Sequence, residues 1–392
     1  MPLSPRGSGF VRAFAAAVLS MTCGTLVLSA QKPPPKSDSK PDPAAQAQAM
    51  AQQKEIQALV RTADAAMSGQ QAPAEFPVQF QNDFLKAQGT RVWVPITLTL
   101  DPSKMSTSAV TLYLRVTPRG MTAPPAPTAP PDKSDKDKKK DGKMPLASPA
   151  IPATAYPYED VSFLDVKPAA AGQPLRIQHG ISVPAGSYDL YIVLHERPFD
   201  AAQGRPATTA AAGAPPAAAA AGKTSVLKQP LDVPNYAAGE FTTSTVILAE
   251  RVDQLPTPIP PDQQSERPYA FGQTEIVISP DHKFKKSQEL IVLVQIYNPV
   301  VTPEKKFNLE ATYTFFRQDA GAEKKFNSTE PQSFSSDTMG AGFDPSGNSS
   351  IQAGQGVALQ SFPEGAYRLE IKITDKLNAK TLTQTVNFTV TP

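Results

Sequence analysis

The sequence is poor in the residues from which many catalytic and metal sites are built. It contains one cysteine, Cys23, and three histidines, His179, His195 and His282, among 392 residues. One thiol cannot close a disulfide within the chain, and the histidines lack the spacing of metal-ligand pairs. The sequence also lacks the nucleophile-elbow, zinc-protease and phosphate-loop motifs. We therefore expect a non-enzymatic protein without a metal or another cofactor.

The sequence also lacks an excess of charge of either sign. Its 38 lysines and arginines and its 36 aspartates and glutamates give a formal net charge of +2. Nucleic-acid binding requires a concentrated basic surface. The charge balance therefore argues against a nucleic-acid partner.

Long apolar runs are confined to the N-terminal residues. Arg6 and Arg12 precede an apolar run over 13–28, and small residues follow it. This order predicts a signal peptide over 1–30, with an uncleaved membrane anchor and lipidation at Cys23 as alternatives. Cleavage there would remove both arginines and the cysteine, leaving no net charge and no thiol. We expect an exported protein that is periplasmic, envelope-associated or secreted, with no transmembrane span in the mature chain.

Proline, in contrast, is abundant, with 42 residues, about twice its average share. Most of the excess lies between blocks of other composition, in segments with too little apolar surface to offset the entropy of ordering them. These segments are a tether that starts at residue 31, insertions near 119–153 and 199–223, and a linker over 254–266. We expect a solvated tether, disordered insertions and a semi-rigid linker.

A single helix is predicted within 31–74, after the tether. Over 44–68 the apolar residues recur at helical spacing, namely Ile56, Leu59, Val60, Ala63 and Met67. Gly69 supplies the stop. One apolar stripe can dock on a sheet or pair with another helix, and we expect docking.

Alternation of apolar and polar residues predicts two β-rich modules, over 75–253 and 267–392. The strands predicted in the first are 90–100, 109–118, 158–166, 175–183, 184–196, 223–233 and 240–252. Those predicted in the second are 271–279, 288–297, 307–317, 356–362, 363–375 and 380–390. We expect 90–100 and 109–118 to pair as a hairpin. Pro95 cannot donate to a ladder, so we expect an edge or a bulge there.

One turn and strand occur twice, at 184–196 and 363–375. Each copy begins with Pro-x-Gly, which reverses the chain, and continues with Tyr, Leu and Ile in alternation with other residues. Tyr188 and Tyr367 are placed like the tyrosine corner of immunoglobulin-like sandwiches, whose hydroxyl bonds nearby backbone. The predicted fold class is all-β, with two tandem immunoglobulin/fibronectin-III-like β-sandwich modules, one N-terminal helix and disordered insertions.

Three stretches carry a resemblance to known proteins: Tyr269-Ala-Phe-Gly, residues 290–298 ending in Ile-Tyr-Asn, and residues 361–376 around the second repeat. They resemble the C-terminal immunoglobulin-like modules of uncharacterised exported bacterial proteins. The resemblance covers the last part of the chain and, more loosely, the first module. It implies the fold and the compartment, and it brings no activity with it.

Large apolar residues also occupy positions that alternation turns away from the two cores. They are Trp93, Tyr113, Tyr191, Val193, Ile291, Leu293 and Phe316, with His195 beside them. Such two-sided strands indicate that something covers the second face. The cover is either internal, from the helix, the 240–252 strand or the other module, or else a partner bound at an exposed patch. We predict internal cover and a mostly buried Trp93.

These observations leave three functional hypotheses. The first is a non-enzymatic scaffold that binds another envelope or extracellular protein. The alternative is non-catalytic polysaccharide binding, with the outward aromatics Trp93 and Tyr191 as stacking platforms. The third is a hydrolase with a site formed by His179, His195 and Asp189.

Overall fold

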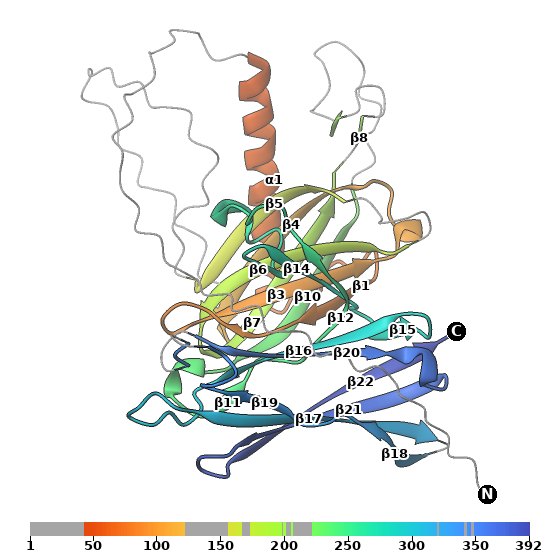
Figure 1. Ribbon diagram of the computed structural model, residues 1–392. Coiled ribbons are helices and arrows are strands. Elements are labelled where there is room, and N and C mark those ends of the chain that lie inside the picture. Colours follow the sequence, from red (N-terminus) through yellow and green to blue (C-terminus); the bar gives the residue numbers. More distant parts are fainter. Residues whose placement is uncertain are drawn as a thin grey trace, which may run out of the picture.

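The computed structural model describes residues 43–121, 156–166, 173–197, 199–200, 205–206, 222–319, 321–340, 343–345 and 349–392. Two β-sandwiches lie one above the other, and a single helix runs alongside the first (Figure 1). The predicted fold class of tandem immunoglobulin/fibronectin-III-like sandwiches with one helix is confirmed. The predicted signal peptide, the tether over 31–42 and most of the two predicted insertions lie outside the described residues.

The first sandwich contains two four-stranded antiparallel sheets. One sheet is formed by β1 (Val78–Asn82), β2 (Leu85–Lys86), β3 (Arg91–Leu100) and β6 (Leu175–Pro184). The facing sheet has the order β10 (Thr224–Val233), β7 (Gly186–Glu196), β4 (Ala109–Pro118), β5 (Tyr158–Asp165). Inward residues of both sheets, such as Val94, Leu112 and Ile192, form the core.

The second sandwich has two larger sheets. The first contains β11 (Thr242–Thr243), β12 (Ile247–Gln254), β13 (Ala270–Phe271), β14 (Thr274–Ile278), β16 (Glu289–Tyr297) and β20 (Ile351–Ala358). The second contains β15 (Lys283–Lys285), β17 (Asn308–Asp319), β18 (Ala322–Ser328), β19 (Gln332–Ser335), β21 (Gly365–Asp375) and β22 (Thr381–Thr391). Inward residues such as Val292, Phe315 and Leu369 form the core between these sheets.

Short elements connect these strands. They are the 3-10 turns η1 (Pro102–Lys104), η2 (Tyr236–Ala238), η3 (Pro261–Gln263) and η4 (Leu359–Ser361), and the ribbon of β8 (Phe199–Asp200) with β9 (Arg205–Pro206). The ribbon lies within the predicted low-complexity insertion, so that segment contains more regular structure than its composition indicates.

The predicted hairpin of 90–100 with 109–118 is wrong. β3 and β4 lie in opposite sheets, joined across the sandwich through η1. Asp101 caps η1, because its side chain accepts the Ser103 N–H. Alternation identifies each strand and its inward face, but both strands of a hairpin and two strands of facing sheets show the same alternation.

The repeat seen at 184–196 and 363–375 extends to the whole sandwich. The strand order β10-β7-β4-β5 in the first module matches β22-β21-β17-β18 in the second. The other sheets also correspond. In the first module β3 pairs with β1 and β2 on one side and with β6 on the other. In the second module β16 pairs in the same way with β11 and β12 and with β20. The two modules are therefore copies of one architecture.

This equivalence moves the predicted boundary between the modules. The strand predicted at 240–252 was assigned to the first module, but β11 and β12 pair with β16, and Leu248 packs in the second core. The predicted linker over 254–266 connects β12 to β13 and β14 within one sheet. Its prolines thus lie inside the second module rather than between the modules.

Both tyrosine corners form. The Tyr367 hydroxyl donates to the Pro363 carbonyl at 2.7 Å, and the Tyr188 hydroxyl donates to the Ala185 carbonyl at 3.5 Å. Gly186 and Gly365 have φ angles of 153° and 140°, where a side chain is rarely tolerated. The Pro-x-Gly turn and its tyrosine are therefore confirmed in both modules.

The irregularity predicted at Pro95 is also present, in the neighbouring strand. β1 ends at Asn82 and β2 begins at Leu85, both paired with β3. Between them the Asp83 N–H donates to the Pro95 carbonyl at 3.0 Å. Because Pro95 has no backbone N–H, it cannot donate a second hydrogen bond to the neighbouring strand, and the ladder is interrupted opposite it.

The helix α1 (Pro43–Met67) agrees with its prediction. Its apolar stripe faces the first sandwich, and the chain leaves it at Gly69, whose φ of 79° is left-handed. The upper part of α1 extends beyond the sheet that its lower part covers (Figure 1). This arrangement places one helix face against the outer side of β4 and β7.

Candidate interaction surfaces

Helix α1 covers the outward apolar residues of the first module. Tyr113 and Val193 are both 0% exposed, and they pack with Leu59 and Ala63 of the helix. Tyr191 is 1% exposed, and the ammonium group of Lys228 lies 5.5 Å from its ring centre. The prediction of internal cover is correct for this face.

A buried ionic contact anchors the helix at the same place. The Arg115 guanidinium forms an ion pair with Asp64 of α1 and another with Glu159 of β5, at 2.8 Å. The guanidinium also lies 4.5 Å from the ring centre of Tyr156, and Arg115 is only 2% exposed. The Tyr113 hydroxyl donates to Glu159, and burial together with this bond raises the pKa of Tyr113.

Sequence reasoning missed this contact, although a signal for it exists. Arg115 follows Tyr113 by two residues on β4, so both side chains point to the same outward face. An arginine on a face that is otherwise apolar indicates a buried partner, because a buried charge is stable only when it is paired.

The second group of outward residues lies at the junction between the modules. Trp93 and Leu293 pack together with Leu85, Tyr269 and Ile278 in one apolar cluster, and Ile291 is buried on the same strand as Leu293. Trp93 is partly buried, and its indole N–H donates to the Pro268 carbonyl at 2.9 Å. The predicted burial of Trp93 is thus confirmed.

The indole needs a glycine beneath it. A Cβ atom at Gly180 of β6 would lie 2.1 Å from the Trp93 ring, far inside van der Waals contact. The Gly180 N–H donates to the Ser265 carbonyl at 2.7 Å, so the segment before β13 runs along the edge of β6. The supposed linker therefore forms part of the junction.

Asp83 forms the polar centre of the junction. It accepts hydrogen bonds from the Tyr269 hydroxyl at 2.6 Å and from the Thr245 hydroxyl at 2.9 Å, both in the second module. Burial raises the pKa of Asp83, and the hydrogen bonds from Tyr269 and Thr245 oppose that rise. The sequence carries no signal for this contact, because the ladder break at Asp83 and the partners of its carboxylate are visible only in the structure.

Phe316 is half-buried on the outer face of the second module. The Arg368 guanidinium lies 4.2 Å from its ring centre and is held there by Glu323 at 2.6 Å and Glu370 at 2.9 Å. Arg368 and Glu370 are partly exposed, and together they form a small cover over Phe316.

His179 lies within β6, in agreement with the strand predicted over 175–183. It is opposite Ile96 and is 4% exposed. Its Nε2 atom is 3.0 Å from the Tyr158 hydroxyl and 3.5 Å from the Asp160 carboxylate. Burial lowers the pKa of His179, while Asp160 and Glu266 act in the opposite direction.

The other two residues of the hypothetical hydrolase site lie in the sheet that faces β6. His195 is half-buried, with Nδ1 2.9 Å from the Thr224 hydroxyl. Asp189 is buried and forms an ion pair with Lys228 at 3.1 Å. Each group is thus engaged with its own neighbours, on strands of two different sheets.

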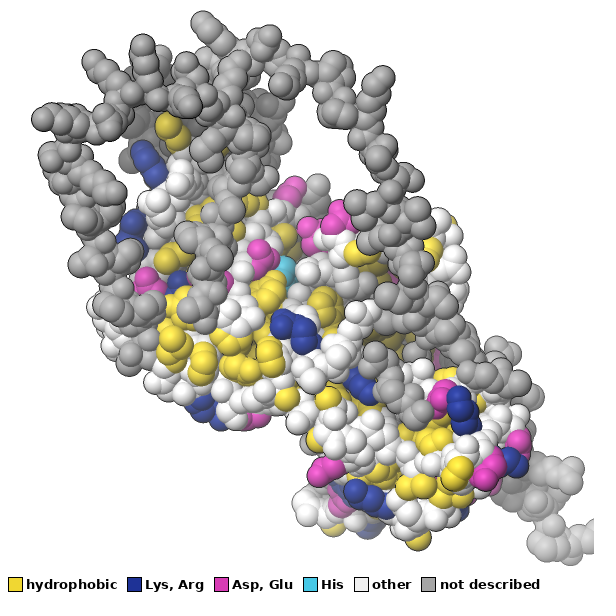
Figure 2. All heavy atoms as spheres, turned by 90° about the vertical axis from the view of Figure 1, so that its left-hand side faces the viewer, with side chains coloured by type: hydrophobic (Ala, Val, Ile, Leu, Met, Phe, Trp, Pro, Cys, Tyr) yellow, Lys and Arg dark blue, Asp and Glu magenta, His cyan; other side chains and the backbone are white. Residues whose placement is uncertain are grey.

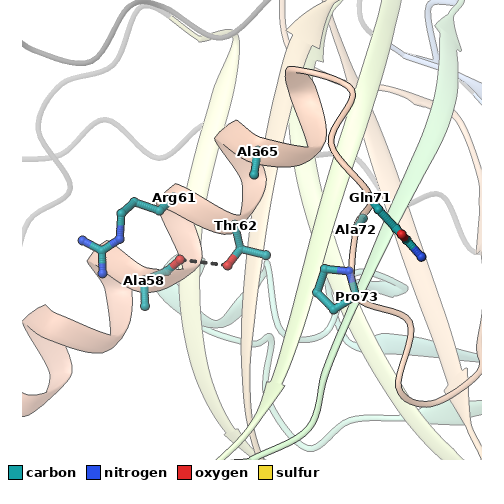
Figure 3. A pocket seen from close by; sticks show the side chains of 7 residues that line it. All are labelled: Ala58, Arg61, Thr62, Ala65, Gln71, Ala72 and Pro73. Atoms are coloured by element: carbon teal, nitrogen blue, oxygen red, sulfur yellow. Dashed lines mark hydrogen bonds between the residues drawn. The ribbon is translucent and has the colours of Figure 1, made fainter.

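Two shallow cavities are open to solvent. One, of about 390 Å³, lies between α1 and the segment that follows it (Figure 3). It is lined by Ala58, Arg61, Thr62, Ala65, Gln71, Ala72 and Pro73. The other, of about 260 Å³, lies between β6 and β14 and is lined by Arg176, Gln178, Glu266, Glu275, Ile276, Val277 and Ile278. In the first, Thr62 already donates to the Ala58 carbonyl at 3.0 Å, as Figure 3 shows.

The described residues contain neither a metal-binding cluster nor a helix that could cross a membrane. Across the described ranges, no group of three or more His, Cys, Asp or Glu residues is placed to hold a metal ion. In that same part of the chain, α1 falls short of the apolar character that a membrane-crossing helix requires.

Comparisons with known proteins return no family. No family model matches the chain, and no curated protein matches it. Among solved structures, a calcium binding mutant of Bacteroides uniformis beta-glucuronidase 2 is 10% identical, with a TM-score of 0.22. The match covers 79% of this chain and 32% of that enzyme. At this level of similarity the enzyme's activity does not transfer to this chain.

Proposed function

We propose that this chain is an exported bacterial scaffold protein without enzymatic activity, which binds another protein in the cell envelope or outside the cell. One observation carries the proposal: the outward apolar faces of both modules are used to join the two sandwiches and the helix to each other. Trp93, Asp83 and Gly180 of the first module all bond to the second. These contacts join the sandwiches and the helix into a single body. A scaffold protein needs such a body, because it must hold its binding surfaces at a constant distance from one another.

The covered aromatics favour a protein partner over a polysaccharide. Stacking on a sugar requires an open ring face, whereas Tyr191 is 1% exposed and Trp93 is packed in the junction. The hydrolase hypothesis is also disfavoured, since His195 bonds Thr224 and Asp189 bonds Lys228. Export rests on the basic and apolar pattern over 1–30.

Crosslinking in the native host tests the proposal. The full-length chain is treated with an amine-reactive crosslinker in intact cells, its adducts are identified by mass spectrometry, and each partner is purified and titrated. We expect a stoichiometric protein complex from the exported fraction. N-terminal sequencing of the mature chain checks export independently.

Two results would contradict the proposal. One is co-sedimentation with insoluble glycans at micromolar affinity. The other is hydrolysis of a substrate that is lost in His195→Ala, with the fold retained. Matched assays on Thr224→Ala, which removes the hydrogen-bond partner of His195, distinguish loss of a catalytic group from loss of its position.

A further inference from the structure

The loops at one end of the second module have properties unlike the rest of its surface. They are 298–307, between β16 and β17, and 376–380, between β21 and β22, and they form the left-hand end of that module in Figure 1. Among described residues, four large hydrophobic side chains are exposed: Met50, Val300, Phe326 and Leu377. Two of the four, Val300 at 38% and Leu377 at 43%, lie in these loops.

A single buried carboxylate positions both apolar side chains. Asp375 is 0% exposed, and its two oxygens accept the Val300 N–H at 2.8 Å and the Leu377 N–H at 3.0 Å. Hydrogen bonds from backbone N–H groups to a carboxylate are charge-assisted and strong. The two loops are thereby fixed relative to each other before any partner arrives, which reduces the entropy cost of binding.

The backbone of the same loops is held in unusual conformations. The described non-glycine residues with positive φ include Asn298 at 53°, Lys305 at 59° and Ala379 at 59°, and the remaining one is His282. Asn298 is held by hydrogen bonds from its side chain to the Tyr236 and Glu240 carbonyls at 3.0 and 2.9 Å. Left-handed conformations at non-glycine residues are costly, and they cluster at functional sites.

The same two loops are rich in lysine. Residues 298–307 and 376–380 contain four lysines and one glutamate. Lys305 and Lys376 pair with Asp344 at 3.2 Å and Glu310 at 3.0 Å. Lys306 and Lys380 are exposed and form no close ion pair with another described residue, while Lys306 interacts electrostatically with Glu304 of the same loop. Figure 2 faces this end of the molecule and shows hydrophobic side chains beside basic and acidic ones.

We propose that this loop end, defined by Val300, Leu377, Lys306 and Lys380 and fixed by Asp375, binds a protein segment that presents an apolar anchor flanked by carboxylates. The inference rests on the proposed function and names its contact surface. An apolar centre with a polar rim is the common anatomy of protein interfaces, and the excess of four lysines over one glutamate in these loops favours an acidic partner.

The other two exposed hydrophobic side chains serve as controls. Phe326 of β18 packs its ring against Phe362 at 4.8 Å and Tyr367 at 5.7 Å between ring centres, so it is tied to its own module. Met50 lies on the upper part of α1. Both are exposed and apolar, but neither is in the loop end.

The first step of the test locates the contact. A photo-reactive amino acid is placed singly at position 377, 326 or 50 of the full-length chain in the native host, and adducts are identified by mass spectrometry after irradiation. We expect a protein adduct at position 377 that is absent at positions 326 and 50.

The second step measures binding of the identified and purified partner. The double variant Val300→Ser, Leu377→Ser should weaken binding by at least about ten-fold, as loss of a central apolar anchor does. Lys306→Glu, Lys380→Glu should weaken it as well and reduce its dependence on salt. The control Phe326→Ser should bind like the wild type, and thermal unfolding checks that all variants are folded.

The outcomes separate the two proposals. Unchanged affinity in the Val300→Ser, Leu377→Ser variant, or adducts at position 326 or 50 without one at 377, overturns the loop-end inference and leaves the scaffold function intact. Absence of protein adducts at all three positions and with the general crosslinker contradicts the scaffold function, and the loop-end inference fails with it.

Discussion

Tyr367 and Tyr188 perform the same task in two modules with different geometry. Each hydroxyl donates to a carbonyl of its own Pro-x-Gly turn, at 2.7 Å for Tyr367 and at 3.5 Å for Tyr188. The shorter bond lies in the optimal range for a hydroxyl donor and the longer one lies outside it. The sequence shows both tyrosines in the same place, but it does not show this difference in distance.

The pair provides a matched prediction. Tyr367→Phe should lower the free energy of unfolding by about 1 kcal/mol, because it removes one well-formed hydrogen bond and leaves the Pro363 carbonyl without that donor. Tyr188→Phe should have a clearly smaller effect. Urea unfolding followed by circular dichroism measures both, and equal losses would show that the hydroxyl distance is not what matters.

His179 offers a residue-scale prediction with a pH dependence. It faces Tyr158 and Asp160 of β5, and Glu266 from the segment that leads to β13. Burial lowers the pKa of His179 below its ordinary value of 6.5. The unfolded chain therefore takes up the proton first on acidification, and the stability contributed by neutral His179 is complete above pH 6.5.

That contribution is lost as the pH falls through the lowered pKa. The difference in unfolding free energy between the wild type and His179→Gln should thus be largest above pH 6.5 and should narrow on acidification. Unfolding in urea at a series of pH values measures the difference, with His195→Gln as a control for the loss of an imidazole elsewhere. A gap that stays constant or widens at low pH would refute this assignment.

At the scale of elements, the sequence pattern of α1 predicts the helix itself but not the surface on which it docks. Its bounds and apolar stripe could be predicted, because helical spacing and Gly69 are both in the sequence. Its docking site could only be narrowed to an outward apolar face. The choice among faces depends on Arg115, which pairs with Asp64 of the helix across a sheet surface that sequence spacing does not reveal.

For the strands, too, the sequence predicts their positions but not their pairing. The alternation and the repeat predicted most strands and their inward faces, but the pairing of β3 with β6 rather than with β4 is a long-range choice. Likewise, 240–252 has the alternation of any strand. Only its pairing with β16 shows that it opens the second module.

The docked helix gives a testable consequence. Leu59→Ala removes a buried side chain from the contact with Tyr113 and Val193, and it should cost about 2–5 kcal/mol of helix docking. Gln57→Ala, at an exposed position of the same helix, should cost little. Hydrogen exchange of the α1 amides, read by mass spectrometry, measures both. Equal protection in the two variants would mean that the apolar stripe does not hold the helix.

At the scale of the whole molecule, the two sandwiches are joined by contacts that the sequence suggested only in part. Outward apolar residues predicted a covered face, and Trp93 and Leu293 do meet in one cluster. The polar centre at Asp83 could not be predicted, since its partners Tyr269 and Thr245 belong to another module. The outward residues were thus predicted as a class, and the internal cover predicted for them is found at the junction.

This arrangement also limits which apolar side chains stay exposed. With α1 over one face and the second module over another, the apolar groups that stay exposed in the described residues are few, and the loop end of the second module has two of them. In the proposed function, the repeated sandwich is the frame, and the loops at the end of the second module are the proposed contact surface.

The outward apolar residues join the two modules into one body, and Trp93 reports directly on whether they do. It is the single tryptophan of the chain and lies in the junction, bonded to Pro268. Acrylamide quenching of its fluorescence in the native protein should be several-fold slower than that of free tryptophan, and unfolding in urea should abolish the difference. Quenching of the native protein at the rate of free tryptophan would contradict this claim, because it would mean that the face of the first module is open.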